Sequence, residues 1–203
     1  MKNIIKNTMI LTAITVVAGL LLGVVYNITK EPIAAAQEKT KQEAFRAVLP
    51  DADNFEEYPG FDADAAADLV SAAGYSDDIS EVAVGVDGSG EAVGYIVNVT
   101  SHSGYGGDIQ ISVGIMSDGT VKGIEMLAIG ETAGLGMKAK EPEFKSQFAD
   151  KKVEKFSYTK TGEEGDDKID AISGATITTS AVTNAVDSAL VYFQSELGGG
   201  ANE

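Results

Sequence analysis

A long uncharged segment near the N-terminus constrains this chain most. Residues 7–29 contain no charged side chain and are rich in isoleucine, leucine, valine and alanine. At about 1.5 Å of rise per residue, a helix of this length crosses a hydrocarbon core of about 30 Å. The run is apolar on every face, so a buried helix of a soluble protein is a less favoured alternative. We therefore predict a transmembrane anchor over residues 1–30.

A cleaved signal peptide is the alternative for this segment. Such peptides have an apolar stretch of about 7–15 residues followed closely by small residues at the cleavage site. Here the apolar stretch is longer, and the small residues at 34–36 come well after it. The length favours an uncleaved, single-pass anchor in the cell membrane.

Charge is distributed unevenly along the chain. Residues 1–30 contribute +3 to the formal net charge of −16, so the remainder carries −19. Such an acidic body argues against nucleic acid and against anionic lipid surfaces as partners. The basic residues that flank the anchor are nearly balanced: Lys2 and Lys6 before it, and Lys30, Lys39, Lys41 and Arg46 after it. With the acidic body, they favour a cytoplasmic N-terminus and a domain on the outer face.

Composition narrows the chemistry. The chain has no cysteine, which excludes disulfides, iron–sulfur ligation and thiolate catalysis. Its single histidine, His102, excludes a histidine-rich metal site and disfavours a Ser-His-Asp triad. The aspartates between residues 51 and 64 lack the glycine and glutamate spacing of a calcium loop, so no metal site is predicted. Any redox work must therefore rely on a bound organic cofactor.

The remaining chain reads as a connector and one domain. Helix-forming residues between Pro32 and Pro50 predict a connector helix over 31–50. Residues 51–203 form the extracytoplasmic domain, with its motif core at 80–197. The patterns predict helices over 62–73, 142–148 and 179–197, and strands over 81–86, 92–100, 109–116, 121–129 and 153–158. Glycines 198–200 are expected to fray. This order predicts an α+β fold with a mainly antiparallel sheet and flanking helices.

A small-residue motif precedes the last predicted helix. Residues 170–176 read Asp-Ala-Ile-Ser-Gly-Ala-Thr, and two threonines and a serine follow at 178–180. A helix N-terminus presents unpaired N–H groups and a favourable dipole to a phosphate, and the glycine lets a ligand approach closely. The plainer alternative is that one hydroxyl among 178–180 caps the helix.

Two glycine-bearing loops accompany this motif. Gly104-Tyr105-Gly106-Gly107 is weakly specific, because a plain connection between strands has the same composition. Glu131-Thr132-Ala133-Gly134-Leu135-Gly136 is more specific, because it combines a carboxylate, a hydroxyl and one apolar side chain. Such a set suits the edge and the face of a flavin ring.

In this order, the stretches resemble the G subunit of the Rnf electron transport complex. They also resemble the FMN-binding domain family and the related C subunit of the sodium-translocating NADH:quinone reductase. The resemblance covers nearly the whole chain. One departure is Ala133, where the family commonly has proline, and this leaves the loop less rigid.

The resemblance implies FMN bound covalently through a phosphoester to Thr176, attached by a separate flavin transferase. It implies an electron-carrying subunit of a translocase, without substrate turnover of its own, that works with other membrane and peripheral subunits. The complex would connect ferredoxin and NAD to Na⁺ or H⁺ movement. The residues expected to contact the cofactor are Glu131, Thr132, Leu135 and Lys138 near the ring, Ser173, Gly174, Ala175 and Thr178 near the phosphate, and also Tyr105, Gly134, Gly136 and Asp170.

Three alternatives stay open at this point. The chain could be the equivalent flavin subunit of a sodium-translocating NADH:quinone reductase. It could instead be a membrane-tethered sensory module that holds FMN or another phosphorylated ligand. The third alternative is a structural ectodomain in which Thr176 has no ligand.

Overall fold

The structure, a computed structural model, describes residues 1–198 and divides into two units, Met1–Lys41 and Gln42–Glu203. Helix α1 (Lys2–Val48) forms the first unit and ends within the second. Large apolar side chains of the first unit are exposed, for example Leu22 at 71%. Within residues 1–198, α1 is the helix whose length and composition suffice to cross a membrane. Glycines 199 and 200 of the expected frayed end lie outside the described residues.

Helix α1 corrects one expectation. A separate connector helix starting near Pro32 was predicted, but the helix continues through this proline without a break. Proline removes a single backbone donor, and an internal proline costs about 3 kcal/mol. Long runs of good helix formers on both sides keep the rest of the hydrogen-bond ladder intact.

A five-stranded sheet forms the centre of the second unit. Its order is β1-β2-β3-β4-β5, and every neighbouring pair is antiparallel. The strands are β1 (Asn54–Glu57), β2 (Asp78–Val86), β3 (Ala92–Ser101), β4 (Ile109–Met116) and β5 (Val121–Ile129). Strands β2 to β5 confirm four of the predicted strands, and the antiparallel sheet with its helices confirms the predicted α+β fold class. Strand β1 was missed because Asn-Phe-Glu-Glu at a sheet edge has no alternating apolar pattern.

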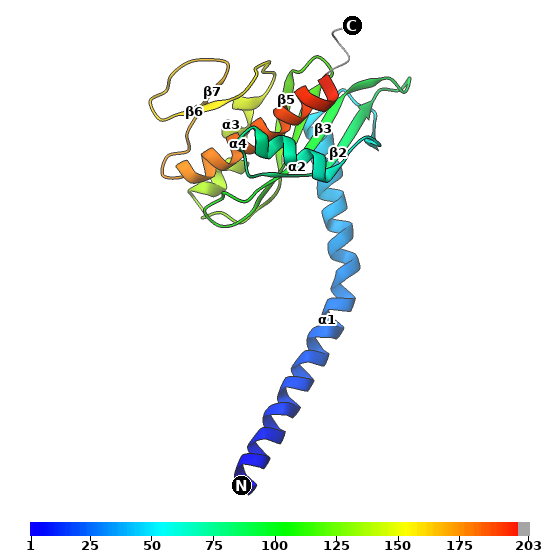
Figure 1. The fold of residues 1–203 in the computed structure, drawn as a ribbon, viewed down its shortest axis with the longest axis vertical. Helices are drawn as coiled ribbons and strands as arrows, with labels where there is room; N and C mark the ends of the chain where they lie inside the picture. The colour runs from blue at the N-terminus through cyan, green and yellow to red at the C-terminus, as the bar shows by residue number, and fades with distance from the viewer. Residues whose placement is uncertain (199–203) are drawn as a thin grey trace. The chain divides into compact units, whose positions relative to one another are not determined.

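Helices α2 (Ala63–Ala72) and α4 (Thr176–Tyr192) lie side by side on one face of this sheet (Figure 1). Asp62 caps α2 by accepting the N–H groups of Asp64 and Ala65. Helix α4 is buried along most of its length and continues as a π-helical turn over Phe193–Leu197. It begins three residues earlier than predicted, at Thr176 itself.

The opposite face of the sheet is covered by the C-terminal end of α1. Phe45, Val48 and Leu49 pack there against Ala83 and Ile96, and all five are buried. The approach is close because Gly114 has no side chain, and a Cβ at that position would lie 2.1 Å from the carbonyl oxygen of Val48. The end of α1 is therefore part of the domain core.

Short elements connect the sheet to α4. After β5 come the 3-10 helix η1 (Gly136–Lys140), α3 (Pro142–Lys145) and a second 3-10 turn, η2 (Ser146–Phe148). The strand predicted over 153–158 is wrong in its bounds, because β6 covers only Ser157–Thr159. Its one partner is the three-residue β7 (Lys168–Asp170), in parallel, so pairing extends no further. Strand β7 leads directly into the motif before α4.

Candidate functional site

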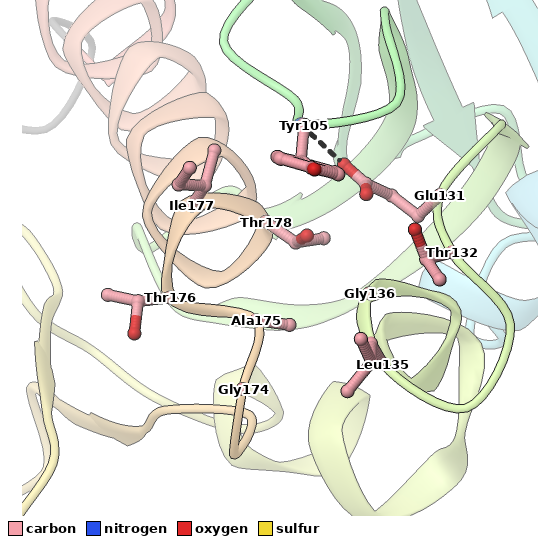
Figure 2. A pocket seen from close by; sticks show the side chains of 10 residues that line it. All are labelled: Tyr105, Glu131, Thr132, Leu135, Gly136, Gly174, Ala175, Thr176, Ile177 and Thr178. Atoms are coloured by element: carbon pink, nitrogen blue, oxygen red, sulfur yellow. Dashed lines mark hydrogen bonds between the residues drawn. The ribbon is translucent and has the colours of Figure 1, made fainter.

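Three segments that are distant in sequence surround one pocket of about 550 Å³ (Figure 2). They are the loop after β3, the loop between β5 and η1, and the start of α4. The lining residues are Tyr105, Glu131, Thr132, Leu135, Gly136, Gly174, Ala175, Thr176, Ile177 and Thr178. The two glycine-bearing loops and the small-residue motif thus meet at one place.

The start of α4 has no side-chain cap. Its N-cap is Ala175, whose side chain cannot accept a hydrogen bond, so the plainer expectation of a cap from residues 178–180 is wrong. The Thr179 hydroxyl instead donates to the Ala175 carbonyl (3.0 Å) and accepts the Ile172 N–H (3.0 Å). The N–H groups of the first helical turn have no acceptor within the helix, so they are available to an anion.

The three threonines of this turn differ in accessibility. Thr179 is fully buried and engaged in the two hydrogen bonds above. Thr178 lines the pocket but is only 1% exposed. Thr176 lines the pocket, is half-buried, and among the hydrogen bonds of residues 1–198 its hydroxyl takes part in none. Thr176 is therefore the hydroxyl of this turn best placed for a reaction with an incoming group.

Gly174 and Gly136 shape the pocket through the absence of side chains. Gly174 adopts a φ of +77°, in the left-handed region that favours glycine. A Cβ on Gly136 would lie 2.6 Å from Thr178 Oγ1 and 2.7 Å from Glu131 Oε2. These two polar groups therefore converge on the space in front of Gly136, and any larger residue would displace one of them.

Glu131 ties the two glycine-bearing loops together. Glu131 is 8% exposed, and its Oε1 accepts the backbone N–H of Tyr105 at 2.8 Å (Figure 2). The loops also pack closely, because a Cβ on Gly106 would lie 2.4 Å from the Gly130 carbonyl oxygen. A buried carboxylate is costly unless it is hydrogen-bonded, so this bond links the two loops to each other.

Three exposed apolar side chains line the same pocket, one from each segment. Tyr105 is 70% exposed, Leu135 42% and Ile177 54%. Ile177 was not among the site residues predicted from sequence. The signal that could have identified it is its place in the first turn of α4, one position before the first buried residue of that helix, Thr178. Large apolar groups exposed around one cavity are typical of a binding site for a ligand with an apolar face.

Four expected site residues are not among those that line this pocket. Lys138, Asp170 and Ser173 line a smaller neighbouring pocket of about 210 Å³. Gln147 belongs to the same neighbouring pocket, and its side-chain oxygen accepts the Asp170 N–H at 2.6 Å. Gly134 lies in the Glu131 loop with a φ of +75°. No cluster of metal-binding side chains was found among residues 1–198.

Comparison with known proteins adds two family matches. Residues 104–191 match the FMN-binding domain family, and residues 1–48 match the RnfG N-terminal region. The first match begins at the Gly104 loop and ends within α4, so it contains all ten residues that line the pocket.

Relatives match over nearly the full length. The chain is 36% identical to the G subunit of the ion-translocating oxidoreductase complex of Methanosarcina acetivorans, over 97% of this chain and 98% of that protein. It is 35% identical to the G subunit of the Na⁺-translocating ferredoxin:NAD⁺ oxidoreductase complex of Acetobacterium woodii, over 95% and 93%. It is 29% identical to the G subunit of the proton-translocating complex of Clostridium ljungdahlii, over 98% and 96%. The chain therefore belongs to the family of G subunits of ion-translocating oxidoreductase complexes, the Rnf complexes.

Proposed function

We propose that this protein carries one FMN, joined by a phosphoester bond to Thr176 Oγ1, and relays electrons within an Rnf-type ferredoxin:NAD oxidoreductase. The observation that carries the proposal is the difference between the three threonines at the start of α4. Thr176 alone among them lines the pocket, is not fully buried, and has a hydroxyl that takes part in none of the hydrogen bonds of residues 1–198.

The residues of the pocket fit FMN in size and chemistry. Ligand sites of about 300–1,000 Å³ accommodate molecules of this class, and the pocket measures about 550 Å³. A phosphodiester keeps one negative charge, which the N-terminus of α4 stabilises by about 0.3–1 kcal/mol. That energy is too small to retain a cofactor on the outer face of a membrane, whereas a covalent bond prevents its loss.

The other pocket residues would hold the ring. Leu135 and Ile177 supply aliphatic surface for a ring face, while Glu131 and Thr132 supply polar groups for its edge. Gly136 keeps the space between Glu131 and Thr178 open. When bound, FMN supplies transfer of one or two electrons, which suits a carrier placed between different redox partners.

The anchor explains how such a carrier would work. Helix α1 would span the cell membrane once, with the N-terminus in the cytoplasm and residues 51–203 as the domain on the outer face. Tethering keeps a redox group at high effective concentration beside other membrane subunits. The expected partners are the other subunits of the complex and a flavin transferase for maturation. One relative is named for Na⁺ translocation and another for proton translocation. We propose that electron transfer through this protein is likewise coupled to the movement of one of these two ions.

The attachment is tested by co-expression with a flavin transferase, followed by a denaturing gel viewed under ultraviolet light. We expect a fluorescent wild-type band, a dark band for Thr176→Ala and a fluorescent band for the neighbouring Thr178→Ala. A dark wild-type band from the native host would contradict covalent attachment.

The relay is tested separately from the attachment. Membranes from the native host are reduced chemically, and the flavin absorbance is followed after NAD is added. We expect reoxidation in wild-type membranes and none in membranes with Thr176→Ala. Flavin that stays reduced with every acceptor tried would instead favour the sensory module.

A further inference from the structure

The loop Ser103–Gly107 needs restraint to keep its place in the pocket. It connects β3 to β4, contributes Tyr105 to the lining, and donates the Tyr105 N–H to Glu131. Three of its five residues are glycine, and Gly107 has a φ of +115°. Glycine loses more conformational freedom on ordering than any other residue, so such a loop favours disorder unless its ends are fixed.

His102 fixes both ends of this loop. It stands directly before the loop, and its Nδ1 lies 3.0 Å from Oδ1 of Asp108, which follows the loop. Its Nε2 lies 2.9 Å from Oδ2 of Asp78 at the start of β2. The ring thus closes the loop across its base and ties that base to the neighbouring strand.

The geometry specifies the charge of the ring. An ionised carboxylate only accepts hydrogen bonds, so both ring nitrogens must donate. Neutral imidazole has one N–H group, whereas imidazolium has two. A neutral ring would therefore leave one of the two carboxylates facing a nitrogen lone pair.

The charges around the ring act in the same direction. Hydrogen bonds to Asp78 and then to Asp108 raise the pKa of His102 to about 8, against a small opposing effect of burial. A third carboxylate, Asp77, interacts with the ring electrostatically; it is buried and accepts a hydrogen bond from the Ser188 hydroxyl. A raised histidine pKa means that the stabilisation is complete below about pH 6.5 and is lost as the pH rises through about 8.

We propose that His102, as an imidazolium, is a positioning residue that holds the Ser103–Gly107 loop in the conformation that presents Tyr105 to the pocket and its N–H to Glu131. The consequence for flavin rests on the proposed function, but the clamp itself does not. Deprotonation of His102 removes the donor for one of its two carboxylates, so it weakens the clamp and loosens the Tyr105 side of the pocket.

The test uses the full chain in lipid nanodiscs, without flavin and without a histidine tag. Since His102 is the only histidine, its imidazole NMR signals titrate without overlap. Hydrogen exchange of the 102–109 segment is measured at pH 7 and 9 and corrected for the intrinsic effect of pH. We expect a His102 midpoint near pH 8 and exchange that is up to about fivefold faster at pH 9, the size of effect that exposed ion pairs produce.

Variants separate a clamp from a merely structural role. His102→Gln should show the fast exchange already at pH 7, without a further step, and Asp108→Ala, which removes the acceptor of the Nδ1–H group, should behave similarly. His102→Arg keeps the charge and two donors, so its exchange should stay slow at both pH values. Asp118→Asn, which removes an exposed carboxylate from the β4–β5 turn, serves as the control and should match wild type.

The clamp is overturned if His102→Gln exchanges like wild type at both pH values, or if His102 titrates near pH 8 without any change in the loop. With flavin attached, the fluorescence of the wild-type protein should change with the same midpoint and that of His102→Arg should not. A protein that takes up no flavin would contradict the proposed function and leave the result on the clamp intact.

Discussion

Helices α1 and α4 reverse the usual relation between polarity and burial. Residues 7–29 of α1 are uncharged and mostly apolar, yet Leu20, Leu21 and Leu22 are each more than 60% exposed. Helix α4 contains threonine, serine, asparagine and aspartate, yet twelve of its residues are buried. The difference shows that composition alone does not decide which helix forms a protein core.

The polar side chains of the two helices find hydrogen-bond partners in different ways. In α1, Thr8 and Thr29 donate to carbonyls one turn earlier in the same helix, as a helix in lipid requires. In α4, Thr183 does the same, but Asp187 reaches outward and accepts the Phe156 N–H at 2.7 Å and the Tyr75 hydroxyl at 3.2 Å. The polar side chains of α4 therefore form hydrogen bonds with other parts of the domain as well as with their own helix. The threonines of α1 named here bond only to carbonyls of α1 itself.

The largest effect should come from placing the same charge in both helices. Leu190 is 1% exposed and Leu21 is 62% exposed. Leu190→Asp buries an unpaired carboxylate and should cost about 5 kcal/mol or more of the free energy of unfolding, enough to unfold a typical domain. Leu21→Asp should leave the thermal unfolding of the domain unchanged but weaken membrane insertion by about 2.5–3.5 kcal/mol.

Calorimetry in detergent and carbonate extraction of membranes measure these two effects. Equal loss of domain stability in both variants would contradict the contrast between the helices.

The second prediction concerns the pH dependence of stability that arises from Asp187, the buried carboxylate of α4. Burial raises the pKa of Asp187 to about 6, against the lowering effect of its hydrogen bonds to Phe156 and Tyr75. Between pH 3.8 and about 6, the folded state therefore binds this proton and the unfolded state does not, so stability falls as the pH rises through this window. Residues 7–29 of α1 contain no ionisable carboxyl or amine and make no such contribution.

Asp187→Asn should remove this dependence while keeping an acceptor for the Phe156 N–H. We expect the difference in unfolding free energy between wild type and variant to change by up to about 3 kcal/mol between pH 4 and 7. Urea unfolding at both pH values measures it. A difference that stays constant with pH would show that Asp187 does not titrate in this range.

A third effect concerns the pocket at the start of α4. Gly136→Ala would push a methyl group against Thr178 Oγ1 and Glu131 Oε2, at a cost of about 1–3 kcal/mol. We expect a lower ratio of bound flavin to protein and a modest loss of thermal stability. Gly123→Ala in β5 is the matched control, because nothing lies within 4 Å of a Cβ placed there. Full flavin occupancy in Gly136→Ala would show that this close approach does not shape the site.

The smallest effect should come from a glycine of α1. Nothing in the described chain lies within 4 Å of a Cβ placed on Gly23. Gly23→Ala should therefore leave both the melting temperature of the domain and its flavin content unchanged. Absorbance and calorimetry on the same sample check this, and a change in either would mean that α1 contacts the domain through this position.

Prediction from sequence succeeded where one pattern dominates. The period of two predicted β4 and β5 with their observed bounds. The patterns failed where tertiary contacts decide. The edge strand β1 and the three-residue β7 gain their conformation from partners, and α1 passes Pro32 because of its long flanks.

The candidate site shows the same division. The motifs predicted nine of the ten residues that line the pocket, because each motif carries unusual composition. Ile177 was missed because an isoleucine at a helix start is ordinary until the fold shows it exposed. Lys138, Asp170 and Ser173 line the neighbouring pocket instead, although Gly174 lines the first one, and no sequence pattern reports on which side of the chain two cavities form.

The most direct test of the central claim is the mass of one peptide. Trypsin cleaves after Lys168, and residues 169–203 contain no lysine or arginine, so one peptide that begins at Ile169 contains Thr176, Thr178 and Thr179. In protein purified from its native host, we predict that this peptide carries one FMN phosphoester and that fragmentation places it on Thr176. An unmodified peptide, or FMN placed on Thr178 or Thr179, would contradict the account.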